Sequence, residues 1–241
     1  ALLGMQLYAE MTYLDECPDE HLHARFKRCC HCDAQAFLDL SLFNYLPGMS
    51  PGTSANPANV GKVLLYQDPL IQLFENDLAG YPVSEHYESL VGRFARHAAE
   101  NPEYPELFDF YTAMAHMLAL KSRWHEQAGP IVRTGDRERA AALCEDVSAI
   151  IDAIHALRTA WRTLWEKTNK PHGFEVIEVR LGGVAARFAT AGEKMRAFAV
   201  GEADTIPELL EECLPLSRYE DNHFSCTNVM GMISTASKID W

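Results

Sequence analysis

The residues most suited to binding or catalysis lie in one short segment, 169–183, which has the sequence NKPHGFEVIEVRLGG. Its charged and basic side chains could hold a polar ligand or a partner domain at the end of a helical bundle. Its proline and three glycines equally fit a tight helix–helix crossing, since glycine permits close backbone approach. Both interpretations remain open, with the structural one favoured. The polar candidates are Lys170, His172, Glu175 and Arg180.

A zinc site is the other chemistry that residue spacing suggests. Cys29 and Cys32 have Cys-x2-Cys spacing, and His21 and His23 lie shortly before them. A structural zinc ion needs four converging ligands, usually from two such pairs, and the chain has no second pair. We therefore expect no metal and no cofactor here. Asp33 is predicted to cap a helix over 34–46, and the cysteines to close the preceding helix.

Other signatures of catalysis are absent from the sequence. It has no Gly-x-Ser-x-Gly elbow, no phosphate-binding glycine loop and no His-Glu-x2-His motif. Its seven cysteines make an odd number, which argues against a secreted disulfide framework and for reduced thiols in the cytoplasm. The face bearing His21, Arg25 and Arg28 is expected to be solvated.

Three amphipathic helices are needed to position these residues. Apolar side chains in 141–167 recur at alternating spacings of four and three, which predicts a bundle helix with Asp136 as its N-cap. Two further runs have the same spacing. The positions are Leu143, Val147, Ile150, Ile154, Leu157, Trp161 and Leu164; then Leu107, Tyr111, Met114, Leu118 and Lys121; then Tyr87, Val91, Phe94 and Ala98.

The connections define the fold class. Segments 100–106 and 129–136 are short and contain proline or glycine, which favours antiparallel neighbouring helices. Residues 47–61 form a long polar connection without periodicity, and 216–241 form a mixed tail. The prediction is an all-α protein: an antiparallel helical bundle with a long polar loop and an irregular C-terminal tail.

The segment after residue 173 is predicted to begin another helix. Pro171 cannot continue the preceding helix, and Gly173 allows a positive φ angle. If the new helix starts early, Arg180 and Arg187 share one face. A run of small residues should let another element approach closely. These are Gly182, Gly183, Ala185, Ala186 and Ala189.

Charge and hydropathy exclude several classes of function. The 34 acidic and 21 basic side chains give a net charge of −13, which would repel nucleic acid and anionic membranes. No apolar run reaches the roughly 18 residues that a membrane-spanning helix needs. The N-terminus lacks the features of a signal peptide and opens on apolar residues, so we expect part of a longer protein.

Three segments of the chain resemble a known family. KPHGFEVIEVRLGGVAAR (170–187) and NPANVGKVLLYQDPLIQLFE (56–75) resemble segments of the C-terminal helical domain of bacterial β-N-acetylhexosaminidases of glycoside hydrolase family 20. LLGMQLYAEMTYL (2–14) resembles the last helix of their catalytic barrel. The resemblance implies that residues 1–14 end an upstream (β/α)8 barrel and that 15–241 form the C-terminal domain.

The resemblance also implies an activity for the parent protein. Such enzymes remove terminal N-acetylglucosamine or N-acetylgalactosamine from glycans by substrate-assisted catalysis, which departs from the usual two-carboxylate scheme. Their catalytic Asp–Glu pair lies in the barrel, so no residue of this chain is expected to be catalytic, and the isolated chain is expected not to hydrolyse glycosides.

Three roles for the domain follow. It could support the barrel or mediate homodimerisation. It could instead complete the active site with Tyr66, Gln67, Asp68 or Arg180, which lie in polar, non-periodic segments where binding residues are often found. The alternative outside the family is a stand-alone α-helical binding or interaction protein.

Overall fold

The structure is a computed structural model, and it describes residues 2–49 and 59–213. Within those ranges every regular element is a helix, which confirms the all-α prediction. The centre of the predicted polar loop (50–58) and nearly all of the predicted tail lie outside the described residues.

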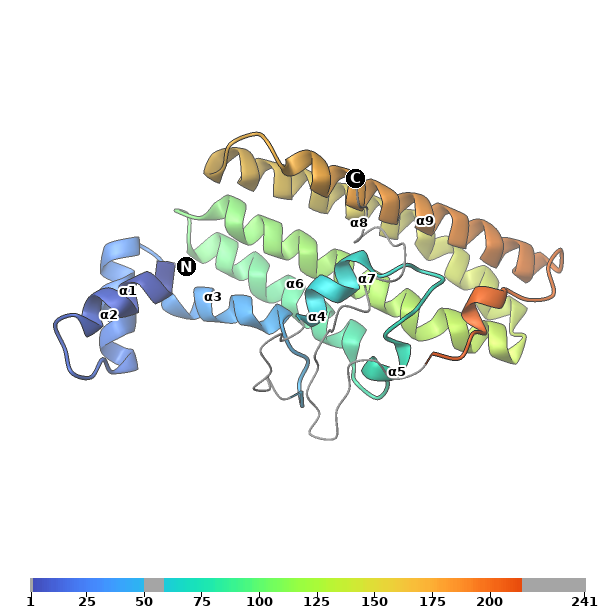
Figure 1. Cartoon of the computed structure of the whole chain (residues 1–241), viewed down its shortest axis with the longest axis horizontal. Coiled ribbons are helices and arrows are strands. Elements are labelled where there is room, and N and C mark those ends of the chain that lie inside the picture. The colour runs from blue at the N-terminus through green and yellow to red at the C-terminus, as the bar shows by residue number, and fades with distance from the viewer. Residues whose placement is uncertain (1, 50–58, 214–241) are drawn as a thin grey trace.

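Four long helices form the bundle (Figure 1). They are α6 (Val83–Glu100), α7 (Pro105–Thr134), α8 (Arg137–Thr168) and α9 (Phe174–Val200). Each packs against the next in the chain, and the short connections make neighbours antiparallel, as predicted. The predicted seam of α8 faces the core: its members from Leu143 to Leu157 are buried, and Trp161 and Leu164 are half-buried.

The ends of α8 and α9 follow from local chemistry. The Asp136 side chain accepts a hydrogen bond from the Arg139 amide, which confirms it as the N-cap of α8. Gly173 adopts a φ of 99°, and α9 begins at the next residue. That early start places Arg180 and Arg187 two turns apart on one face, as the sequence suggested.

Two expectations about these helices are wrong. The connection predicted at 129–136 is only Gly135 and Asp136, because α7 continues through Pro130 to bury Ile131 and Val132. The close approach predicted at Gly182 is absent, because a Cβ there would meet no atom within 4 Å and the residue is exposed, although Ala185 of the same predicted run is buried. Gly192 makes the close approach, since a Cβ would lie 3.0 Å from Val147 of α8.

A shorter segment crosses the face of the bundle. It contains α4 (Val60–Tyr66) and α5 (Glu75–Leu78), and α4 contacts both α7 and α9. Asn59 caps α4 by accepting from the Lys62 amide, so the helix starts two residues inside the predicted loop. Gly61 is required there, because a Cβ would lie 2.8 Å from the Phe43 carbonyl oxygen.

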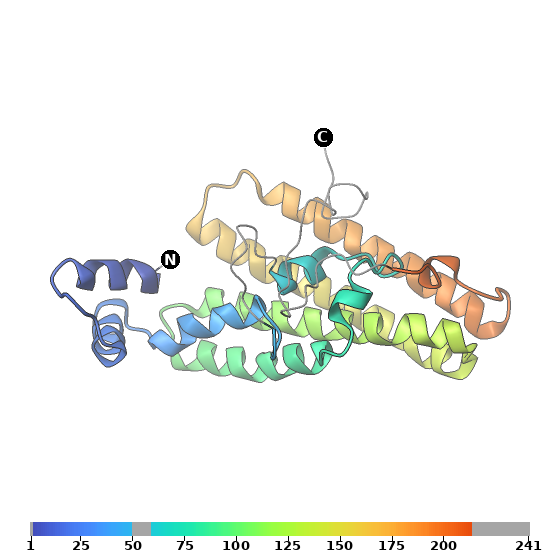
Figure 2. The same ribbon diagram turned by 60° about the horizontal axis from the view of Figure 1, so that its bottom comes forward.

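The N-terminal helices extend from one end of the bundle (Figure 2). They are α1 (Leu2–Met11) and α2 (Asp19–Cys30). The predicted solvated face of α2 is exposed at His21 and Arg28, and it also contacts α1, since Glu10 accepts from Arg25 and lies 2.8 Å from His21. The two partners hold the pKa of Glu10 down at about 2.

The chain enters the bundle through α3 (Ala34–Leu38), followed by a 3-10 helix over Asp39–Phe43. Asp33 caps α3 through the Gln35 amide, as predicted, but the single helix expected over 34–46 is divided in two. The Cys32 thiol is buried and donates to Asn101 Oδ1 at the end of α6. This contact joins the N-terminal helices to the bundle.

Candidate functional site

The end of α4 is held on the bundle by a buried lysine. Lys121 lies on α7 with none of its surface exposed, and its Nζ donates to the backbone oxygens of Leu65 at 3.0 Å and Gln67 at 3.1 Å. The last carbonyls of a helix lack partners within the helix, and burial without a donor would be costly. The lysine therefore satisfies the C-terminus of α4 from a neighbouring helix.

The surroundings of Lys121 affect its protonation. Burial lowers its pKa to about 7, partly opposed by the nearby carboxylate of Asp68. The neutral amine still has two N–H groups, which match the two carbonyls. In addition, Nζ lies 5.5 Å from the centre of the Phe188 ring on α9, so one side chain connects three elements.

Asp68 fixes the turn that follows α4. Its Oδ1 accepts from the amides of Leu70 at 2.8 Å and Ile71 at 3.0 Å. The guanidinium of Arg187, on α9, donates from Nε to Oδ2 at 2.6 Å and from Nη2 to Oδ1 at 3.2 Å. This two-point contact has the fork geometry that arginine offers a carboxylate. The turn is thereby attached to α9 as well as α7.

The electrostatics of Asp68 argue against acid–base chemistry. Burial raises its pKa, but hydrogen bonds from Arg187 and from the two amides outweigh burial and bring the pKa below its ordinary value. A carboxylate held ionised by four hydrogen bonds is a poor proton carrier at neutral pH. Its geometry suits a structural role.

The remaining contacts of this turn are also structural. Trp124 of α7 is fully buried and donates its indole N–H to the Pro69 carbonyl at 3.0 Å. Tyr66 is buried and its ring lies 5.8 Å from the guanidinium carbon of Arg180. Burial raises the pKa of Tyr66, which keeps its hydroxyl neutral.

The candidate residues predicted from sequence form two groups. The structure brings Tyr66, Gln67, Asp68 and Arg180 together where α4 meets α9. The other three lie on the α8–α9 turn, where Glu175 accepts from the Gly173 amide at 2.8 Å. That contact and the glutamate's own amide lower its pKa. The carbonyl oxygen of Lys170 accepts a hydrogen bond from the Trp165 indole, and the side chains of Lys170 and His172 are exposed.

Sequence reasoning missed the residues that organise the site. The sequence did point to Lys121, because it occupies an apolar position in the periodic pattern of its helix, where a buried charged residue needs a partner. Arg187 was placed on the face of Arg180, but its carboxylate partner lies 119 positions away in the chain. No pattern in the sequence indicated a role for Trp124.

Two kinds of site find no support in the described part of the chain. No group of three or more His, Cys, Asp or Glu side chains there is arranged to hold a metal ion. None of the helices described is long and apolar enough to cross a membrane.

Comparison with known families decides the assignment. Residues 35–228 match the family model of the Glycoside Hydrolase 20C C-terminal domain. The chain belongs to this family. The match confirms the resemblance drawn from the motifs at 56–75 and 170–187. No curated protein matches the chain.

In this C-terminal domain the Asp68 turn can be tested by two substitutions. D68N keeps an oxygen for the two amides and loses the ion pair with the half-exposed Arg187, at a cost of about 1 kcal/mol. D68A also leaves both amides without an acceptor and should cost roughly 3 kcal/mol. Urea unfolding measures both, with D152N at an exposed aspartate as the charge control. Equal costs for D68N and D68A would contradict the proposed role of the turn.

Lys121 predicts a pH dependence of stability. The lysine loses its proton at about pH 7 in the folded domain and at about 10.4 when unfolded. The unfolded state therefore binds more protons between these values, and this group makes the fold more stable as pH rises from 7 to 10. K121M should remove that increase, measured as urea midpoints across this range, whereas the exposed K27M should retain it. An unchanged slope in K121M would refute the assignment.

Proposed function

We propose that this chain is the supporting C-terminal domain of a family 20 β-N-acetylhexosaminidase, packed against an upstream catalytic (β/α)8 barrel. The parent enzyme would release terminal N-acetylglucosamine or N-acetylgalactosamine from glycans, with the substrate's acetamido group as nucleophile. Family membership and the resemblance of residues 2–14 to a barrel helix support this proposal.

The observation that carries the proposal is that α1 buries a charged residue and exposes its apolar ones. Its buried residue is Glu10, while its large apolar side chains face outward. Met5 and Tyr8 of α1 are 65% and 76% exposed, and Tyr13, just after the helix, is 87% exposed. Large exposed apolar side chains gathered in one short segment are typical of an interaction site. The helix also precedes the matched region, which starts at residue 35. An upstream barrel of the same protein is the partner we propose for it.

The contacts of the α4–α9 region favour support over participation in catalysis. Asp68 is only 7% exposed and Tyr66 only 6%, and the hydrogen bonds of Asp68 are used within the domain. Residues that complete a neighbouring active site need free polar atoms at the surface. These side chains instead hold the bundle together, which would give the barrel a rigid surface.

Substitution of the α1 surface tests the proposal. In the longer protein that carries the barrel, M5S/Y8S should lower the melting temperature and the yield of active enzyme, because both side chains would leave a buried interface. In the 241-residue chain the same double variant should change stability by less than about 0.5 kcal/mol, since both positions are exposed. V200S, at an exposed valine of α9, serves as the control.

Two results would contradict the proposal. The first is an M5S/Y8S variant of the longer protein that melts and turns over like V200S. The second is a self-association of the 241-residue chain, seen by sedimentation, that M5S/Y8S abolishes and that persists in the longer protein. That outcome would assign the α1 surface to a homodimer.

A further inference from the structure

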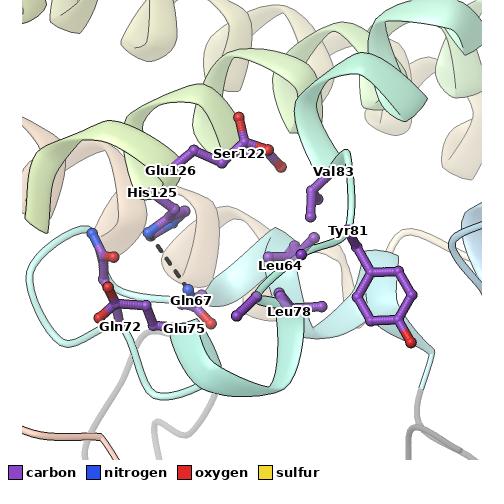
Figure 3. Close-up of a pocket in the computed structure, with 12 residues that line it drawn as sticks. Leu64, Gln67, Gln72, Glu75, Leu78, Tyr81, Val83, Ser122, His125 and Glu126 are labelled. Atoms are coloured by element: carbon purple, nitrogen blue, oxygen red, sulfur yellow. Dashed lines mark hydrogen bonds between the residues drawn. The ribbon is translucent and has the colours of Figure 1, made fainter. Parts of the chain in front are cut away.

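A pocket lies where α4 and the α5–α6 region face α7 (Figure 3). It has a volume of about 240 Å³. Its walls come from α4, the α5–α6 region and α7. The lining residues are Leu64, Gln67, Gln72, Glu75, Leu78, Ala79, Gly80, Tyr81, Val83, Ser122, His125 and Glu126.

Buried polar atoms without partners gather on this pocket. Gln67 Oε1, Ser122 Oγ and His125 Nε2 are each buried and have no hydrogen-bond partner among the described residues. Gln67 and Ser122 are 5% and 1% exposed. Buried polar groups in folded proteins are nearly always satisfied, so each exception calls for a cause. Three exceptions on one pocket indicate a ligand that pairs with them.

The hydrogen-bonding character of these atoms can be assigned. The Gln67 amide nitrogen lies 3.5 Å from His125 Nδ1, and an amide nitrogen can only donate (Figure 3). The imidazole proton is therefore on Nε2, which is left as a donor without a partner. Burial, with a contribution from Lys121, lowers the pKa of His125 to about 3, so the ring is neutral. Gln67 Oε1 accepts, and the Ser122 hydroxyl can do either.

A hydroxyl group satisfies this arrangement, because it accepts from the imidazole N–H and donates to the amide oxygen at once. An amine could not accept in its protonated form, and a carboxylate could not donate.

The charges around the pocket favour an uncharged ligand. No lysine or arginine lines it, so an anion would find no counter-charge. Its two carboxylates already have partners: Glu75 accepts from Arg133 at 2.6 Å, and Glu126 accepts from the amide and hydroxyl of Ser84.

The size and the opposite wall define the ligand class. The volume equals that of about eight liquid waters, below the roughly 300 Å³ of a typical drug site. Leu64, Leu78 and Val83 form an apolar wall facing the polar atoms (Figure 3). We propose that this pocket binds a small uncharged polyhydroxylated molecule of monosaccharide size, with its C–H face on the leucines and its hydroxyls on Gln67, Ser122 and His125. This inference does not depend on the proposed function.

Three probes with one carbon skeleton test the ligand class: glucose, glucosamine and gluconate, which are neutral, cationic and anionic. The ring resonances of His125 in the full chain, assigned by their loss in H125Q, report on the pocket during NMR titration. Glucose should shift them saturably, and the charged analogues should bind at least tenfold more weakly.

Two variants locate the binding. S122A removes a buried unpaired hydroxyl and should fold at least as well as the natural sequence. Q67M keeps the backbone oxygen that binds Lys121. Each should raise the dissociation constant for glucose about three- to tenfold, which corresponds to the free energy of one hydrogen bond. S89A, at an exposed serine of α6, should leave the affinity unchanged.

Three results would overturn the proposal. The first is the absence of any saturable shift with the three probes, which means that the pocket holds only water. The second is binding of glucosamine or gluconate as tight as that of glucose, which excludes a neutral ligand. The third is an unchanged glucose affinity in both S122A and Q67M, which places the ligand elsewhere.

Discussion

The hydrogen bonds of Lys121 to the end of α4 are the constraint on which this face of the domain depends. Helix α4 ends against the bundle, where water cannot reach its last carbonyls, and the amine of Lys121 binds the oxygens of Leu65 and Gln67. Removing it would leave two buried acceptors unpaired. Because the lysine belongs to α7, the end of the short helix α4 is attached to one of the long helices of the bundle.

Other features follow from this attachment. The turn after α4 begins at the carbonyls that Lys121 holds, and it brings Asp68 against Arg187 of α9. The same placement brings the side chain of Gln67 against His125, which forms the floor of the pocket. One helix end therefore determines both the rigidity of the domain and the geometry of its pocket.

The sequence predicted the bundle because the bundle depends on local patterns. The heptad spacing from Leu143 to Leu157 and the caps at Asp33 and Asp136 involve residues within a few turns of each other. The course of α7 through Pro130 was not predictable in this way, since burial of the residues after it outweighs the broken helix hydrogen bond. Gly192 was missed for a related reason, because its close neighbour, Val147, lies on another helix.

The candidate site was predicted in part. Two segments far apart in the chain were singled out, and Tyr66 of one does contact Arg180 of the other. The partners that give the site its character come from α7, and no pattern in the sequence indicates which carbonyls a buried lysine will meet. The sequence also did not show which way each face of α9 points: Gly182, Ala186 and Ala189 are exposed, whereas Ala185 is buried and Arg187 binds Asp68 in the turn after α4.

In the proposed arrangement, the residues where α4 meets α9 would support the parent enzyme and take no part in its chemistry. The most direct test is to measure D68A in the longer protein with its barrel, comparing the melting temperature with kcat/KM well below the melt. The account predicts a lower melting temperature with kcat/KM per folded molecule unchanged. A normal melting temperature with lost turnover would contradict it and place this region at the active site.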